Sequence, residues 1–278
     1  MPMEDAIAIE DRGRRILLKW HKLRRQAGEP PFNPDNLRAG LRAGASLEVD
    51  IQVLADDEWV CLHDDLLDFE TNGHGRVAEA SSSDVSRLRI ADANYAPPPL
   101  PEVANEAAAA GPSQAVLQFD LKASRDRLSE KAVTRFTNLV RPIASRCILS
   151  GSDWEAVQKL GSALPSLALG FDPLDLDASF TDAAGAEAFV SHVAEIATGA
   201  RTFYLDRALV ARALSFAVNP ISELKRLCAG ATVDVWTLDP ETPGVERTLH
   251  LAVSAGADQI TTNAPRDLAE VWQRLQSG

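Results

Sequence analysis

The sequence predicts an α/β protein built as a single-domain (β/α)8 TIM barrel, on three observations. The chain has 278 residues, close to the roughly 250 that such a barrel needs. Strand-like and helix-like segments alternate along it, and repeated alternation of this kind specifies a parallel sheet. Eight strand candidates can be counted, which favours a closed barrel over an open doubly wound sheet. No G-x-G-x-x-G motif follows the first strand, so dinucleotide binding is not expected.

Short apolar runs bounded by turn residues mark the strand candidates. The eight runs are residues 16–21, 47–53, 115–121, 147–150, 166–171, 202–205, 232–237 and 259–262. Residues 59–62 are a further short run, which we interpret as a hairpin partner of the second strand and leave out of the count. Residues 1–13 are mostly polar and predict a lead-in, so the barrel domain is expected to span residues 14–278.

Segments with helical character separate these strands. The first has the clearest limits: Asn33 can cap it, Pro34 suits its first turn, Asp35 favours the positive end of the helix dipole, and Gly44 ends it. The other expected helices are residues 82–88, 101–110, 128–140, 153–160, 183–197, 209–216, 221–227, 244–255 and 268–275.

Charge and composition limit the classes of partner. The net charge is −12 with no basic stripe, which argues against nucleic acid or an anionic membrane as the main partner. An anionic ligand must then be met by a local positive site. No run approaches about 18 apolar residues and the N-terminus has no apolar signal segment, so we expect a cytoplasmic protein without stable membrane insertion. Cys61, Cys147 and Cys228 fit no zinc spacing and predict buried apolar residues rather than disulfides.

The densest group of candidate functional residues lies in residues 47–75. Polar and apolar residues alternate there, so Glu48 and Asp50 share one face of a strand. Two carboxylates on one face repel each other, which favours a cation between them. His63 follows on the hairpin strand. From these residues alone, a solvated strand face with an incidental histidine is as good an interpretation as a functional site.

The order of motifs resembles the glycerophosphodiester phosphodiesterase family. That family typically has G-A-D-x-I-E-x-D-V and then V-x-H-D-x-x-L-D-R-x-T-N-G-x-G-x-V, which residues 44–51 and 63–77 match in order. Phe69 departs from the pattern, because it stands where the family usually has arginine.

Further matches extend the resemblance over about residues 15–275. The family's H-R-G is here His-Lys-Leu at residues 21–23, followed by a longer loop, and its P-E-N is Pro-Asp-Asn at residues 34–36. Its E-x-K is Asp-Leu-Lys at residues 120–122. The V-x-x-W-T and G-x-D-x-I-x-T-D motifs of its final third are matched around Trp236 and at residues 256–262.

The resemblance implies metal-dependent cleavage of a glycerophosphodiester to glycerol 3-phosphate and an alcohol. It assigns the metal, Mg²⁺ or Ca²⁺, to Glu48, Asp50 and Asp120, and carboxylates without thiolates suit such hard cations. It assigns general acid and base duties to His21 and His63. The sequence does not decide between these duties, and we favour His21 as the base and His63 as the acid.

Three substrate contacts are also expected from the resemblance. Lys122 would neutralise the phosphate, and Trp236 would pack against the glycerol or the head group, although core packing is nearly as good an interpretation of the tryptophan. Lys22 would replace the family's arginine, with Arg24 or Arg25 of the longer loop as alternatives.

Two other functions remain open. The Asp-Leu-Lys sequence at residues 120–122 is similar to the D-x-K of sphingomyelinase D-like phospholipases in the same superfamily, although the chain has no apolar, membrane-seeking loop. The altered H-R-G motif also fits a catalytically inactive barrel that binds a phosphodiester or a sugar phosphate. The leading expectation is an enzyme whose partner is a small-molecule phosphodiester.

Overall fold

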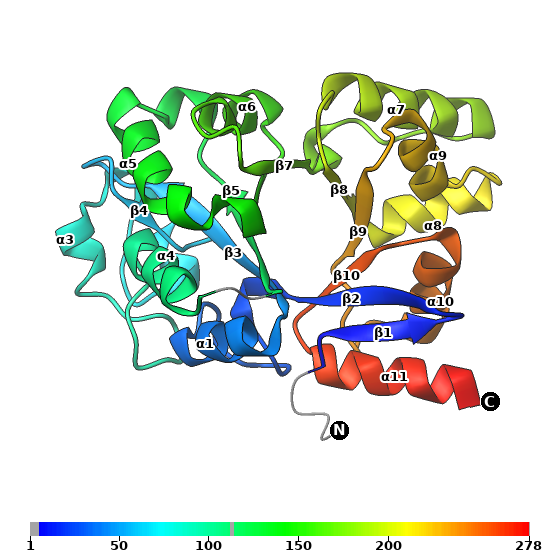
Figure 1. The fold of residues 1–278 in the computed structure, drawn as a ribbon, viewed down its shortest axis with the longest axis horizontal. Coiled ribbons are helices and arrows are strands. Elements are labelled where there is room, and N and C mark those ends of the chain that lie inside the picture. Colours follow the sequence, from blue (N-terminus) through cyan, green and yellow to red (C-terminus); the bar gives the residue numbers. More distant parts are fainter. Residues whose placement is uncertain (1–5, 112–113, 278) are drawn as a thin grey trace. The chain divides into compact units, whose positions relative to one another are not determined.

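The structure is a computed structural model that describes residues 6–111 and 114–277. In this part of the chain the strands are β1 (Ala8–Asp11), β2 (Arg14–Trp20), β3 (Ser46–Val53), β4 (Trp59–Val60), β5 (Val116–Leu121), β6 (Cys147–Ser150), β7 (Ala168–Phe171), β8 (Thr202–Asp206), β9 (Thr232–Trp236) and β10 (Gln259–Thr262). The helices are α1 (Pro34–Ala43), α2 (Leu67–Glu70), α3 (Ser82–Val85), α4 (Leu100–Ala109), α5 (Glu130–Val140), α6 (Trp154–Ser162), α7 (Ala183–Ile196), α8 (Arg207–Ser215), α9 (Pro220–Leu227), α10 (Val245–Ala255) and α11 (Pro265–Ser277). All eight strand candidates are therefore confirmed (Figure 1).

The strand order confirms the predicted fold class. It runs β1-β2-β10-β9-β8-β7-β6-β5-β3-β4, and β2 also pairs with β3. The described strands β2, β3 and β5 to β10 thus form a closed parallel (β/α)8 barrel. The short strand β4 pairs antiparallel with β3, as expected for a hairpin. In such a barrel, functional side chains gather at the C-terminal ends of the strands.

Strand β1 lies within the segment that the sequence predicted as a polar lead-in. It pairs antiparallel with β2, from Ala8 opposite Leu17 to Asp11 opposite Arg14. The connecting residues Arg12 and Gly13 have φ values of 48° and 80°. Positive φ at both central residues is the signature of a two-residue hairpin turn whose twist matches that of the strands. The Arg-Gly pair between two apolar runs was the sequence signal for this hairpin.

The chain divides into two compact units, and each is described by itself. The first unit contains β1, β2 and β8 to β10 with α7 to α11. Helix α11 packs on β1 and β2 (Figure 1), and the indole nitrogen of Trp272 donates to the carbonyl of Glu10 at 2.8 Å. Phe180 packs against a buried cluster of Ala186, Ala213 and Val218.

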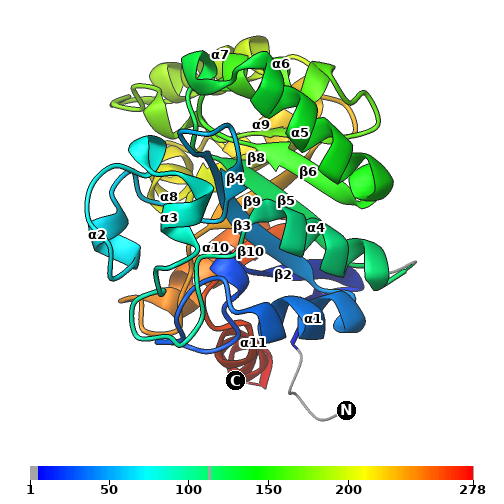
Figure 2. The same ribbon diagram turned by 90° about the vertical axis from the view of Figure 1, so that its left-hand side faces the viewer.

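The second unit contains β3 to β6 with α1 to α6, together with residues 22–24. Helix α4 packs against both α1 and α5 (Figure 2). Phe136 of α5 contacts Trp59 and Phe119, with ring centroids 5.4 and 5.9 Å apart. These aromatic contacts anchor β4 and β5, both of which pair with β3.

Helix α1 has the limits that its capping residues predict. The side chain of Asn33 accepts a hydrogen bond from the Asp35 amide at 2.9 Å, and Pro34 is the first helical residue. Gly44 ends the helix with a φ of 75°, a conformation that glycine adopts without steric cost.

Two further expectations concern cysteines and membrane spans. The three cysteines are free, with Cys61 and Cys147 buried as predicted and Cys228 partly exposed. Across residues 6–111 and 114–277, none of the helices has the length and apolar character required to cross a bilayer.

Candidate functional site

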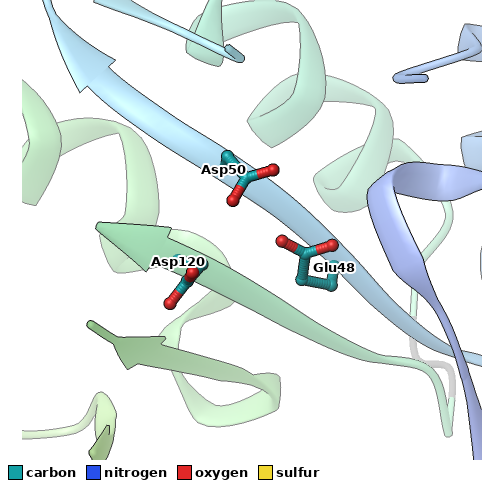
Figure 3. A group of neighbouring side chains, drawn as sticks. All are labelled: Glu48, Asp50 and Asp120. Carbon is teal, nitrogen blue, oxygen red and sulfur yellow. The ribbon is translucent and has the colours of Figure 1, made fainter. Parts of the chain in front are cut away.

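Three carboxylates from two neighbouring strands meet in the second unit. Glu48 and Asp50 lie on β3, and parallel pairing sets Asp50 opposite Asp120 of β5. Figure 3 shows the two side chains on one face of β3 with Asp120 beside them. One oxygen from each carboxylate can be chosen so that all three lie within 4.8 Å of one another. The alternation predicted for β3 therefore places Glu48 and Asp50 on one face of the strand. The register between β3 and β5 adds Asp120 as the third expected metal ligand.

Two of these carboxylates are buried and Asp120 is partly buried, so their charge must be compensated locally. Glu48 is 3% exposed and Asp50 1%. Isolated buried charges are very costly, which is why they pair with cations, bind metals or become protonated. The negative charge also acts on the thiol of Cys61. Burial raises the pKa of this thiol most, and the carboxylates of Asp50 and Glu48 raise it further. The charge pattern attracts cations to this end of β3.

Lys122 supplies one positive charge. Its Nζ atom lies 2.6 Å from Oδ2 of Asp120 and 3.3 Å from Oδ1 of Asp50. Burial alone would lower the pKa of Lys122, but the neighbouring carboxylates of Asp120 and Asp50 outweigh it and raise that pKa. The ammonium is therefore charged at neutral pH. Ser150 also donates to Oδ1 of Asp120 at 2.7 Å, which fixes the orientation of this carboxylate.

Lys22 reaches the same carboxylates from a tight turn after β2. Lys22 and Leu23 have φ values of 51° and 59°, so leucine here takes a left-handed conformation where the resembling family has glycine. The turn is held by its polar groups: the Lys22 amide donates to Oε2 of Glu48 at 2.6 Å, and Asn36 donates to the Leu23 carbonyl at 2.9 Å. The Nζ atom of Lys22 lies 4.0 Å from Oδ2 of Asp50.

The two arginines considered as alternatives to Lys22 make other contacts. Arg24 donates to the carbonyl of Glu29 at 2.8 Å, within its own loop. The guanidinium of Arg25 lies over the ring of Trp20, 5.3 Å from its centroid. Lys22 lies beside Asp50, with its Nζ atom 4.0 Å from Oδ2, as expected for the residue that replaces the arginine.

His63 follows the β4 hairpin and remains partly exposed. Its Nδ1 atom lies 3.1 Å from Oδ1 of Asp64, and both side chains are 38% exposed. A carboxylate beside Nδ1 orients the imidazole ring. This places an imidazole with a neighbouring carboxylate on the loop after β4.

Glu70 is a site residue that the sequence analysis did not identify. Its carboxylate accepts hydrogen bonds from the backbone amides of His63 and Asp64, at 2.6 and 3.2 Å, and its Oε1 atom lies 3.4 Å from Nζ of Lys22. It occupies a variable position of the resembling motif, directly after Phe69. Only its burial, at 8% exposed, distinguishes it from a surface glutamate.

His21 directly follows β2 in the first unit, and two residues that the sequence did not single out, Asn263 and Asp239, orient it. Its Nδ1 atom lies 2.9 Å from Oδ1 of Asn263. The amide nitrogen of Asn263 donates to Oδ2 of Asp239 at 2.6 Å, so the amide oxygen must face the histidine. Nδ1 is then the donor, and Nε2 carries the lone pair that a general base uses. Asn263 immediately follows the matched motif at residues 256–262, so its position could have indicated a role.

Trp236 lies in the first unit at the end of β9, opposite Asp206 in the register of β8 and β9. Its side chain is partly exposed, so it is neither fully in the core nor fully at the surface. A place at the C-terminal end of a barrel strand is where substrate contacts are expected. Its role as a substrate contact stays a prediction.

The chemistry of this group fits a divalent cation. Among the described residues, Glu48, Asp50, Asp120 and Glu70 provide four carboxylates, whereas Lys22 and Lys122 provide two ammonium groups. Among these six side chains the carboxylates outnumber the ammonium groups, and a cluster of carboxylates is where a divalent cation binds. The donors are carboxylate oxygens without a thiolate, which suits a hard cation such as Mg²⁺ or Ca²⁺.

Comparison with solved structures shows the same fold in several related proteins. A candidate glycerophosphoryl diester phosphodiesterase from Silicibacter pomeroyi is 18% identical, with a TM-score of 0.73 over 98% of this chain and 96% of that one. A phosphodiesterase from Oleispira antarctica, solved with the product sn-glycerol-3-phosphate, is 18% identical, with a TM-score of 0.68 over 92% and 96%. A glycerophosphodiester phosphodiesterase from Parabacteroides distasonis is 17% identical, with a TM-score of 0.69 over 93% and 98%.

The sequence comparisons identify the family. Among curated proteins, none matches this sequence closely enough to count as a relative. The model of the glycerophosphoryl diester phosphodiesterase family matches residues 35–267, most of the chain, and confirms the resemblance inferred from the motifs. The chain therefore belongs to the glycerophosphoryl diester phosphodiesterase family and is a phosphoric diester hydrolase.

Proposed function

We propose that the protein hydrolyses a glycerophosphodiester to glycerol 3-phosphate and an alcohol, with one divalent cation bound by Glu48, Asp50 and Asp120. The observation that carries this proposal is the meeting of three carboxylates, two of them buried, with one oxygen of each within 4.8 Å of the others. Family membership supports the substrate class, and the Oleispira antarctica neighbour was solved with sn-glycerol-3-phosphate.

The charges of the site suit a phosphodiester. The cation, when bound, would stabilise the negative charge that builds up on the phosphate oxygens. The ammonium groups of Lys122 and Lys22 would bind other phosphate oxygens as point charges. Trp236 would pack against the glycerol or the head group. Lys22 would then replace the arginine that the family usually has at this position.

The two histidines would divide the proton transfers. Nε2 of His21 would accept the proton of the attacking hydroxyl, because Asn263 holds the ring with its proton on Nδ1. His63, oriented by Asp64, would donate a proton to the oxygen of the departing alcohol. By family expectation the attacking group is the glycerol hydroxyl next to the phosphate. Water would then open the cyclic phosphate with the two roles reversed.

Turnover of glycerophosphocholine tests this proposal. The protein would be dialysed against EDTA, reloaded with Mg²⁺, Ca²⁺ or Mn²⁺, and assayed for glycerol 3-phosphate and choline. Metal-dependent release of both products is expected. No turnover of glycerophosphocholine or of bis(p-nitrophenyl) phosphate with any metal would instead indicate an inactive binding barrel.

The Asp-Leu-Lys sequence at residues 120–122 keeps a phospholipase of the sphingomyelinase D type as the second candidate. The two activities are separated by substrate and product. Cleavage of sphingomyelin or lysophosphatidylcholine in preference to glycerophosphocholine would favour the phospholipase. A panel of glycerophosphodiesters would then identify the preferred alcohol.

A further inference from the structure

Glu70 joins two parts of the second unit that contribute to the proposed site. Its Oε2 atom accepts the backbone amides of His63 and Asp64, and its Oε1 atom contacts the ammonium of Lys22 at 3.4 Å. The carboxylate and the ammonium are both largely buried, at 9% and 11% of their side-chain surface exposed. One side chain thus connects the loop that carries His63 to the cation that lies beside Asp50.

The pairing limits what Lys22 can do. A buried carboxylate needs a cation and donors around it, and Lys22 is the ammonium that Glu70 contacts. The same ammonium lies 4.0 Å from Oδ2 of Asp50, so its charge is shared between two carboxylates. A lysine is a flexible point charge, and it needs such a restraint to keep a defined position.

We propose that Glu70 is a positioning residue that restrains Lys22 at the edge of the site, so that the lysine contacts the phosphate without closing fully onto it. This inference rests on the proposed function, because it takes Lys22 to be a phosphate-binding group. The restraint matters most after cleavage. A phosphomonoester product carries more negative charge than its diester substrate and would be retained by an unrestrained lysine.

The substitution Glu70→Gln removes the charge but leaves an amide oxygen that can accept the amides of His63 and Asp64. Released from its ion pair, Lys22 should bind phosphate more tightly. We expect the dissociation constants of inorganic phosphate and glycerol 3-phosphate, measured by calorimetry on the metal-loaded protein, to fall about tenfold. Both kcat and KM for glycerophosphocholine should fall, since product release slows.

Two further variants separate this role from a structural one. Glu79→Gln removes the same charge from an exposed position of the same unit and should leave phosphate binding and kcat unchanged. In a Lys22→Met background, Glu70→Gln should no longer tighten phosphate binding. Thermal unfolding of each metal-free variant shows that the folded state is retained.

Two results would overturn the inference. One is an unchanged or weakened affinity for phosphate in folded Glu70→Gln. The other is an undiminished gain in the Lys22→Met background, which would make Glu70 a general negative charge rather than a restraint on Lys22. Phosphate binding is measured without turnover. A wild-type protein that fails to cleave glycerophosphodiesters would therefore count against the proposed function alone, and the shift in binding would still decide the role of Glu70.

Discussion

Two buried groups of lysines and carboxylates differ in their charge balance, and the difference indicates which of them is a site. In the first unit, Lys19 and Asp234 form an ion pair at 2.9 Å, with 2% and 0% of their side-chain surface exposed. Gln259 and Thr261 also donate to the carboxylate of Asp234, the threonine at 2.7 Å. The ammonium of Lys19 lies over the ring of Tyr204, 4.3 Å from its centroid. Here one negative charge meets one positive charge.

In the second unit several carboxylates lie together, and they outnumber the lysines beside them. Glu48, Asp50 and Asp120 lie together with Lys122, and Glu70 accompanies Lys22. Four carboxylates lie with two ammonium groups, whereas Asp234 lies with one ammonium of its own. A single buried carboxylate is therefore weak evidence for function, whereas several carboxylates that meet from neighbouring strands indicate a metal site.

The largest effect is expected from removing a carboxylate of the unbalanced group. Asp50→Ala should abolish detectable metal binding and activity, because Asp50 is buried beside the other two carboxylates and lies within 4.0 Å of both lysines. Glu48→Gln should weaken metal affinity in the same way. Calorimetric titration with Mg²⁺, Ca²⁺ and Mn²⁺ measures the affinity, and circular dichroism checks the fold. Full activity of wild-type protein after exhaustive dialysis against EDTA, with no metal by elemental analysis, would contradict the three-carboxylate site.

The histidines test whether the unbalanced group carries the chemistry. His21→Ala and His63→Ala should each lower kcat by about 10²–10⁴, the usual contribution of a positioned acid or base. If the histidines act as one unit, the double variant should lose less than the product of the two single losses. His74→Ala serves as the control, because His74 is exposed and pairs with Asp68. A normal kcat for His63→Ala together with a reduced kcat for His74→Ala would show that the wrong histidine was chosen.

The balanced pair should affect stability rather than metal binding. Lys19→Met leaves the carboxylate of Asp234 buried without its cation, and breaking a buried pair in this way costs about 3–5 kcal/mol of unfolding free energy. Urea unfolding measures the loss, with the exposed Lys131→Met as a matched control. Metal affinity at 10 °C should remain that of the wild type. Strongly reduced metal affinity in folded Lys19→Met would remove the distinction between the two groups.

The smallest effect concerns the length of one ligand. The family usually has glutamate where this chain has Asp120, and Ser150 and Lys122 hold the shorter side chain in place. We expect Asp120→Glu to lower kcat/KM, because the longer side chain would push the cation towards the other ligands. The measurement is kcat/KM with each metal. A gain of tenfold or more, about 1.4 kcal/mol of transition-state stabilisation, would instead indicate a degenerated family site.

The sequence determined the features that neighbouring residues encode. Alternating polarity predicted a strand with Glu48 and Asp50 on one face, and capping residues predicted α1 from Pro34 to its end at Gly44. Strand–helix alternation predicted the barrel. These patterns repeat within a few residues, because side-chain direction in a strand or helix follows its own period.

Only the tertiary structure decided which distant residues meet. Register between β3 and β5 set Asp120 opposite Asp50, and packing of the loop after β4 buried Glu70 against Lys22. The contact of Asn263 with His21 depends in the same way on residues 242 positions apart in the chain. A glutamate or an asparagine looks the same in the sequence whether it becomes solvated or buried. Its partner is chosen by long-range strand pairing and by the desolvation that follows, neither of which local periodicity encodes.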